Sequence, residues 1–245
     1  MFTDNIIRLD TVDSTNTRLK ELADRGAAEG TVVLARGQTA GRGTVGRSFF
    51  SPEGEGLYLS VLLRPEATVE ELFTLTGRTA VAVRQGIENA CGAPCAIKWL
   101  NDLSLNGKKL CGVLTELSPD LSYVVIGIGI NLTQTNDVFA EQGLGDIATS
   151  LGMEGYPVER EALAASVLQE LEKMYRQFPR GKETCLEQYR AHCLTLGRPV
   201  RFVQDRVERT GTAQEIDDQF GLTVVCEGRK YTVTSGAVQR MEEQV

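Results

Sequence analysis

Short runs of apolar and β-branched residues, separated by glycine, proline and asparagine, dominate the first 130 residues. Runs of this length and composition are typical of β-strands. They predict strands over residues 6–9, 31–35, 57–63, 95–99, 103–105, 110–117 and 123–130. The dipeptide Asn106-Gly107 predicts a two-residue hairpin between two of them, because both residue types tolerate a positive φ. Consecutive hairpins favour a mixed, largely antiparallel sheet over a purely parallel one.

Helical periodicity marks several other segments. Leu19 and Leu22 share one face of a helix that Gly26 ends. Thr68 and Glu71 form a capping box, the usual start of a helix. Further helices are therefore predicted over residues 68–90, 158–178 and 183–193. Because these helices flank the sheet, the predicted fold class is α+β.

The pattern changes near residue 194. Four short β-rich runs follow within about 50 residues, over residues 200–203, 211–216, 222–226 and 230–233. Closely spaced short strands predict a small barrel-like module. We therefore expect two domains, residues 1–194 and residues 195–245.

Composition narrows the class of protein. The chain has 245 residues, 42% of them hydrophobic and 24% charged, and no apolar run approaches the length of a membrane span. Neither a secretory signal nor a C-x-x-C pair occurs, so we expect a cytoplasmic protein with reduced cysteines. The net charge of −7 argues against nucleic-acid binding. His192 is the only histidine, which excludes histidine triads and clustered histidine metal sites.

A loop rich in glycine and arginine occupies residues 38–47. Its glycines match the spacing G-x-G-x-x-G of dinucleotide-binding proteins, but residues 47–52 disfavour the helix that must follow, and no acidic residue stands at the expected ribose position. The loop instead indicates a mobile segment whose amides can approach phosphate, with Arg42 and Arg47 as cationic contacts. A solvated surface loop is the alternative.

Polar residues end the strand that contains Lys98. Asn101 and Asp102 follow it, and a carboxylate at a strand end can hold Mg²⁺ through one oxygen while leaving room for phosphates. Lys109 lies across the next hairpin, which can return it to the same place. The alternative is a hairpin with exposed lysines at its tip and no role in binding. We expect this alternative to hold for Lys108.

Two further clusters place polar residues beside the expected sheet. Ser14, Thr15 and Asn16 precede the first helix, where capping is the commonest role of such residues. Asn131 ends a strand that contains Gly127 and Gly129, and glycines there admit either a ligand or a neighbouring backbone. The residues by themselves leave both questions open.

Taken in order, these five motifs resemble the biotin protein ligases. That family has Ser-Thr-Asn near the start, a Gln-Thr-x-Gly-Arg-Gly-Arg loop, a Lys-Trp-Pro-Asn-Asp strand end, a lysine beyond the hairpin and a Gly-x-Gly-x-Asn strand. All five lie between Ser14 and Asn131 in this order, and five together are specific where each alone is weak. The resemblance implies a class II synthetase-like core followed by a small SH3-like β-barrel domain.

The resemblance also implies roles for individual residues. Biotin contacts are implied for Ser14, Thr15, Asn16, Gln38, Arg42, Gly43, Thr44 and Lys109. Nucleotide contacts are implied for Arg47, Phe49, Lys98, Asn101, Asp102 and Asn131, with Mg²⁺ at Asp102. Lys109 and Arg42 are the expected catalytic residues, because cations must align two anionic substrates. Arg240 is the candidate for a further arginine that faces the nucleotide.

Three positions depart from the family pattern. Thr44 replaces the second arginine of the loop, Phe49 replaces a tryptophan, and Leu100 replaces a proline. Phenylalanine keeps an aromatic wall for adenine, whereas threonine removes a cation, so we expect weaker retention of an adenylate. Because the chain begins directly at the catalytic region, we expect neither a DNA-binding module nor repressor activity.

The implied activity is ATP-dependent biotinylation. Biotin and ATP would form biotinyl-5'-adenylate, and a lysine of a biotin carboxyl carrier domain would accept the biotin. Mg²⁺ is the expected cofactor, and a monomer or homodimer is expected. The alternatives are a lipoate or octanoate ligase or transferase and an inactive biotin-binding protein. Gln38 and the Gly-Arg-Gly loop favour biotin, while Lys109 and Asp102 favour activity.

Overall fold

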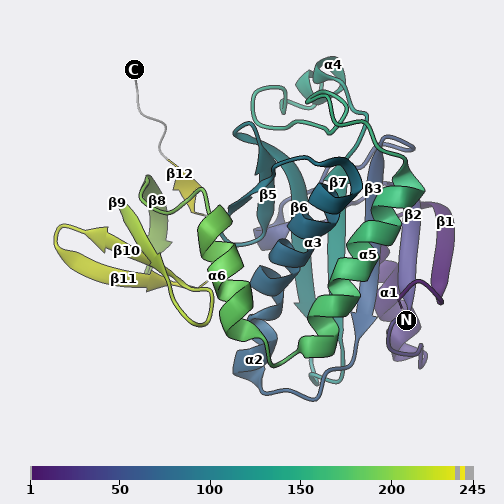
Figure 1. The fold of residues 1–245 in the computed structure, drawn as a ribbon, viewed down its shortest axis with the longest axis horizontal. Coiled ribbons are helices and arrows are strands. Elements are labelled where there is room, and N and C mark those ends of the chain that lie inside the picture. Colours follow the sequence, from purple (N-terminus) through teal and green to yellow (C-terminus); the bar gives the residue numbers. More distant parts are fainter. Residues whose placement is uncertain (1, 235–237, 241–245) are drawn as a thin grey trace.

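A seven-stranded sheet forms the centre of the molecule (Figure 1). The computed structural model describes residues 2–234 and 238–240. The strands of this sheet are β1 (Ile6–Val12), β2 (Val32–Gln38), β3 (Gly56–Leu63), β4 (Ala96–Lys98), β5 (Asp102–Leu105), β6 (Lys108–Leu117) and β7 (Val124–Asn131). They lie in the order β1-β2-β3-β7-β6-β5-β4. Only β1 and β2 pair in parallel among them, so the predicted mixed, largely antiparallel sheet is confirmed.

The local sequence predicts the hairpin of this sheet correctly, but it does not predict the length of the edge strand. The predicted hairpin is present, with φ of 49° at Asn106 and 84° at Gly107. By contrast, β1 continues to Val12, three residues beyond the prediction. Asp10 and Thr11 are polar and exposed, as an edge strand allows, and the pairing of Thr11 with Gly37 and of Val12 with Gln38 extends the strand nonetheless.

The helices are α1 (Thr15–Asp24), α2 (Val69–Phe73), α3 (Leu75–Cys91), α4 (Asn136–Ala140), α5 (Arg160–Gln177) and α6 (Lys182–His192). The Thr68–Glu71 capping box is present. The single helix predicted from residue 68 is divided at Thr74, whose hydroxyl donates to the carbonyl of Glu71 over 2.6 Å, a bond that bends helices. The short helix α4 was not predicted, because five residues carry too little periodicity.

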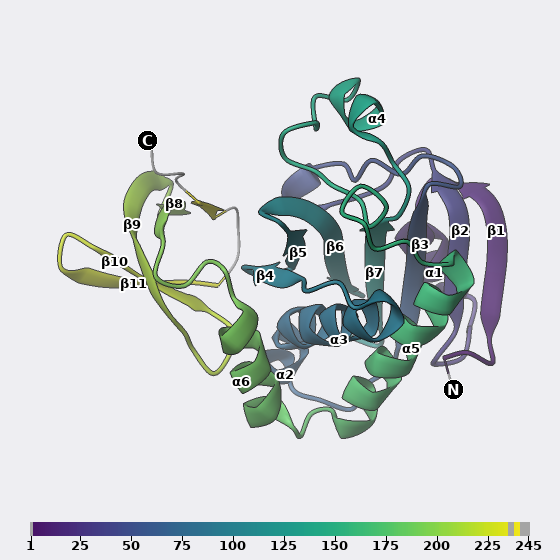
Figure 2. The same ribbon diagram turned by 45° about the horizontal axis from the view of Figure 1, so that its top comes forward.

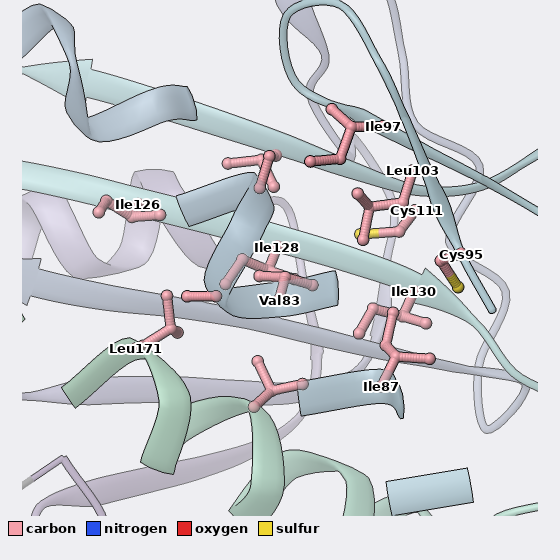
Figure 3. Close-up of a cluster of buried hydrophobic side chains, with 14 of the residues drawn as sticks. Val83, Ile87, Cys95, Ile97, Leu103, Cys111, Ile126, Ile128, Ile130 and Leu171 are labelled. Carbon is pink, nitrogen blue, oxygen red and sulfur yellow. The ribbon is translucent and has the colours of Figure 1, made fainter. Parts of the chain in front are cut away.

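The two faces of the sheet carry different helices. α3 and α5 cover one face, where Val83, Leu171 and Ile128 belong to the main apolar core (Figure 3). On the other face, Leu19 of α1 packs in a smaller cluster with Val125. No helix among the described residues is long and apolar enough to span a bilayer.

The C-terminal strands form a second sheet beside the β4 edge of the first, seen in both orientations (Figures 1 and 2). These strands are β8 (Pro199–Gln204), β9 (Val207–Ile216), β10 (Leu222–Cys226), β11 (Arg229–Val233) and β12 (Gln239–Arg240). They pair antiparallel in the order β11-β10-β9-β8-β12, which confirms the predicted β-rich module. Within the described residues no pairing between β11 and β12 closes it into a barrel.

A glycine lets this second sheet pack tightly on the first part of the chain. A Cβ atom on Gly77 in α3 would lie 2.2 Å from the ring of Phe220. The apolar core continues across this contact into the C-terminal strands. The division into residues 1–194 and 195–245 stays a prediction.

Candidate active site

A pocket lies on the sheet face that carries α1. It is bounded by the start of α1, the loop after β2, and strands β6 and β7. All residues expected to contact biotin line it: Ser14, Thr15, Asn16, Gln38, Arg42, Gly43, Thr44 and Lys109. Arg47, Phe49, Asn101 and Asp102 also line it. Gly127 and Gly129 line it as well, so residues from all five motifs, from Ser14 to Gly129, meet in one place.

One wall of the pocket is a network of neutral hydrogen-bonding groups. The amide and hydroxyl of Thr15 both donate to Gln38 Oε1, over 2.8 and 3.1 Å. Ser60 Oγ lies 2.8 Å from Thr15 Oγ1 and 2.6 Å from Asn16 Oδ1. Ser14 occupies the N-cap position of α1, but its side chain makes no capping hydrogen bond. These side chains therefore organise the pocket wall, beyond the capping role that is commonest for such a cluster.

Gln38 also ties this wall to the loop. Its Nε2 donates to Ser51 Oγ over 2.9 Å, and Ser51 Oγ donates to the carbonyl of Phe49 over 2.9 Å. The side-chain amide of Gln38 thus has a fixed orientation, with its oxygen towards Thr15 and its nitrogen towards Ser51. A preoriented amide discriminates between ligands by the donors and acceptors that they present.

Glycines on two adjacent strands leave room for the ring of Phe49. Gly112 on β6 pairs with Gly129 on β7. A Cβ on Gly129 would lie 2.5 Å from Phe49 Cε1, and one on Gly112 would lie 3.3 Å from Phe49 Cε2. Gly127 leaves room in the same way for Asn16, whose Oδ1 would lie 2.2 Å from an added Cβ. The glycines of β6 and β7 therefore allow side chains to approach the sheet closely.

Lys109 stands beside Asp102 at the edge of the pocket. Lys109 Nζ lies 2.7 Å from Asp102 Oδ1 and 5.8 Å from the centre of the Phe49 ring. The described residues contain no group of three or more metal-ligating side chains. Asp102 is a carboxylate of the kind that Mg²⁺ prefers, so it would be the protein ligand of an ion that arrives with the nucleotide.

The turn that contains Asn101 and leads into Asp102 at the start of β5 is held by residues from the C-terminal part of the chain. The amide of Trp99 donates to Thr195 Oγ1 over 3.1 Å, and its indole donates to the carbonyl of Phe220 over 2.7 Å. The buried hydroxyl of Tyr189 donates to the carbonyl of Leu100 over 3.0 Å. Segments about 100 residues later in the chain therefore fix this part of the pocket.

Two predicted residues do not line the pocket, and the side chain of a third is not described. Lys98 belongs to β4, and Asn131 ends β7; neither lines the pocket. Asn131 instead donates from Nδ2 to the carbonyl of Thr149 and accepts from Gln134. Arg240 is in β12, but its side chain lies outside the described part of the structure. Their roles stay predictions.

Sequence reasoning missed Glu116, Ser60 and Ser51. Glu116 Oε1 lies 3.3 Å from Arg42 Nη2, and Glu116 Oε2 accepts from Asn16 Nδ2 over 2.8 Å. Burial by itself would raise the pKa of Glu116, but hydrogen bonds from Asn16 and Lys20 and the positive charges of Lys20 and Arg42 lower it. The available signal was alternation, because Glu116 follows Gly112 and Leu114 at two-residue spacing on β6.

Comparison with known proteins agrees with this geometry. The biotin/lipoate A/B protein ligase family model matches residues 9–131. The chain is 39% identical to the bifunctional ligase/repressor BirA of Bacillus spizizenii over 220 residues, which cover 88% of this chain and 67% of that protein. It is 32% identical to the biotin–[acetyl-CoA-carboxylase] ligase of Mycobacterium tuberculosis, with 94% and 88% covered.

Solved structures give the same answer. The biotin protein ligase from Aquifex aeolicus in complex with biotin and ATP superposes with a TM-score of 0.81 at 30% identity, covering 97% of this chain and 99% of that one. Fold, motif order and sequence identity thus agree over nearly the whole chain. This protein belongs to the biotin/lipoate A/B protein ligase family and is a ligase of the biotin protein ligase type.

Proposed function

We propose that this protein activates biotin with ATP and transfers it to a lysine of a biotin carboxyl carrier domain. The observation that carries the proposal is the convergence of a neutral, preoriented wall and three cations on one pocket. Gln38 and Thr15 belong to the wall, while Arg42, Arg47 and Lys109 are the cations. A bicyclic urea with a carboxylate tail needs both kinds of partner.

In the first step, a carboxylate oxygen of biotin attacks the α-phosphorus of ATP. The bond to pyrophosphate breaks, and biotinyl-5'-adenylate forms. Arg42 and Lys109 would align the two anions and offset the charge that grows on the phosphate. The ion pair with Asp102 would hold the Lys109 ammonium at the pocket edge before substrates arrive. When bound, Mg²⁺ would neutralise phosphate charge, with Asp102 as its protein ligand.

In the second step, the amine of a carrier lysine attacks the mixed anhydride, forms an amide and releases AMP. The loop around Arg42 and Gly43 would exclude water, which otherwise hydrolyses the intermediate. The relatives from Mycobacterium tuberculosis and Paracoccus denitrificans are named for acetyl-CoA carboxylase, which supports a carboxylase carrier domain as the acceptor.

Exchange of labelled pyrophosphate into ATP tests the first step. We expect exchange with Mg²⁺ that depends on biotin and not on lipoate or octanoate. Exchange with lipoate or octanoate alone would assign the protein to the lipoate branch of the family. A folded protein that shows no exchange with any of these acids would be either a transferase, which needs no ATP, or an inactive binding protein.

A further inference from the structure

Glu116 is shared by two cations from different parts of the chain. Its Oε1 lies 3.0 Å from Lys20 Nζ in α1 and 3.3 Å from Arg42 Nη2 in the loop. Its Oε2 accepts from Asn16 Nδ2 over 2.8 Å. Glu116 itself does not line the pocket, although both Arg42 and Asn16 do. The carboxylate thus connects a loop residue of the pocket to the fixed helix behind it.

The three partners are not equally mobile. Asn16 is 2% exposed and is also bonded to Ser60, and Lys20 lies within helix α1. The Arg42 side chain is 49% exposed and belongs to a loop, whereas that of Glu116 is 18% exposed. Arg42 is therefore the partner that can leave. If it does, Lys20 and Asn16 still compensate the carboxylate, so no half-buried charge is left without partners.

We propose that Glu116 and Lys20 are positioning residues that control where the Arg42 side chain rests. In the free protein, Glu116 holds Arg42 and with it the loop over the pocket. Lys20 competes for the same oxygen, which keeps this contact weak enough for exchange. An anion entering the pocket then takes Arg42 from Glu116, while Lys20 remains. That the anion is biotin or its adenylate rests on the proposed function; the contact itself does not.

Limited trypsin digestion of the free protein measures this contact directly. Trypsin cleaves after arginine, so the rate of cleavage after Arg42 reports how often the loop is released. We expect Glu116→Gln to raise this rate on the order of two- to fivefold, the scale of a partly exposed ion pair. Lys20→Met should lower it. Adding salt should raise the rate in the unaltered protein and have little effect in Glu116→Gln.

A double variant separates this role from simple destabilisation. If Lys20 acts through Glu116, Lys20→Met should have no effect on cleavage after Arg42 once Glu116 is glutamine. Cleavage after Arg36, an exposed residue of β2 that is paired with Glu53, is the internal control and should not change. Equal cleavage after Arg42 in all variants would overturn the proposal, as would a parallel rise after Arg36, which indicates general loosening.

Failure of this inference is distinguishable from failure of the proposed function. The digestion needs no substrate. The expected cleavage pattern in a protein without biotin-dependent exchange would leave the Glu116 contact standing and refute the proposed function. Biotin-dependent exchange together with unchanged cleavage after Arg42 would support the proposed function and refute the role of Glu116.

Discussion

Lys109 Nζ and Asp102 Oδ1 lie 2.7 Å apart, across the two strands of the hairpin that begins at the pocket. The pair is partly buried, with 40% of the lysine side chain and 20% of the aspartate side chain exposed. On the proposed function, this arrangement places one cation and one carboxylate where the nucleotide triphosphate and the carboxylic acid would meet. Lys108, which precedes Lys109 in the chain, does not line the pocket. Its Nζ donates to the carbonyl of Gly145 over 2.9 Å.

Replacing Lys109 should therefore have a much larger effect on activity than replacing Lys108. We expect Lys109→Ala to slow biotin-dependent pyrophosphate exchange on the order of 100-fold, the scale of losing one positioned charged donor. Lys108→Ala should leave the exchange rate within about twofold and reduce stability by about 1 kcal/mol through its lost hydrogen bond. Similar rate losses in the two variants would show that the wrong lysine has been assigned to the pocket.

Thr44 should make the adenylate leave faster than an arginine would. Its hydroxyl accepts from Arg47 Nη2 over 3.0 Å and offers a phosphate only a neutral contact. Charged hydrogen bonds exceed neutral ones by about 1–2 kcal/mol, so Thr44→Arg should slow release of preformed adenylate about 5- to 30-fold. The dissociation rate without acceptor measures this, and Thr44→Ser is the control. Release that is unchanged or faster in Thr44→Arg would remove this position from the phosphate clamp.

Gly129→Ala should displace the Phe49 ring, because its Cβ would lie 2.5 Å from Cε1. Gly112→Ala would require the Phe49 ring to move by only a few tenths of an ångström, so it is the matched control. We expect Gly129→Ala to lower the free energy of unfolding by about 1 kcal/mol more than Gly112→Ala does. In a Phe49→Ala background the difference should vanish, as a double-mutant cycle with urea unfolding would reveal. Persistence of the difference would mean that the ring does not rest on Gly129.

Tyr189→Phe should weaken the turn that carries Asn101. The lost hydroxyl leaves the partly buried carbonyl of Leu100 without its donor, which costs about 1 kcal/mol of unfolding free energy. Tyr123→Phe also removes a side-chain hydrogen bond, the one to Asp24 at the end of α1. We expect both variants to be destabilised, and only Tyr189→Phe to raise the KM for ATP. An equal effect on KM from both would contradict a local role.

The contribution of Glu116 to stability should depend on pH. Its pKa is lowered below the ordinary value of 4.5, so the unfolded chain binds a proton there more readily than the folded protein. The resulting stabilisation is present above pH 4.5 and is lost as the pH falls through the lowered pKa. Unfolding free energies of the unaltered protein and Glu116→Gln should therefore differ at neutral pH and converge in acid. A difference that is the same at both pH values would contradict this assignment.

Sequence alone determined most of the strands, the hairpin and most of the pocket residues, because each is encoded locally. Asn106-Gly107 specifies its own turn, and the motif order identifies the side chains that line the pocket. Other features of the fold could not be predicted from the local sequence. β1 runs longer than its apolar residues because pairing with β2 extends it, and α4 is too short to show a period.

Only the tertiary structure decided which side chains meet. The pairing of Gly112 with Gly129 sets the place of the Phe49 ring, and strand alternation says which residues share a face but not which face bears the pocket. Glu116 meets Asn16 from 100 residues away, and Ser60 does so from 44. These contacts depend on how β3, β6 and α1 pack together. The pattern of a few neighbouring residues does not predict that arrangement, because residues so far apart in the chain do not affect each other's local conformation.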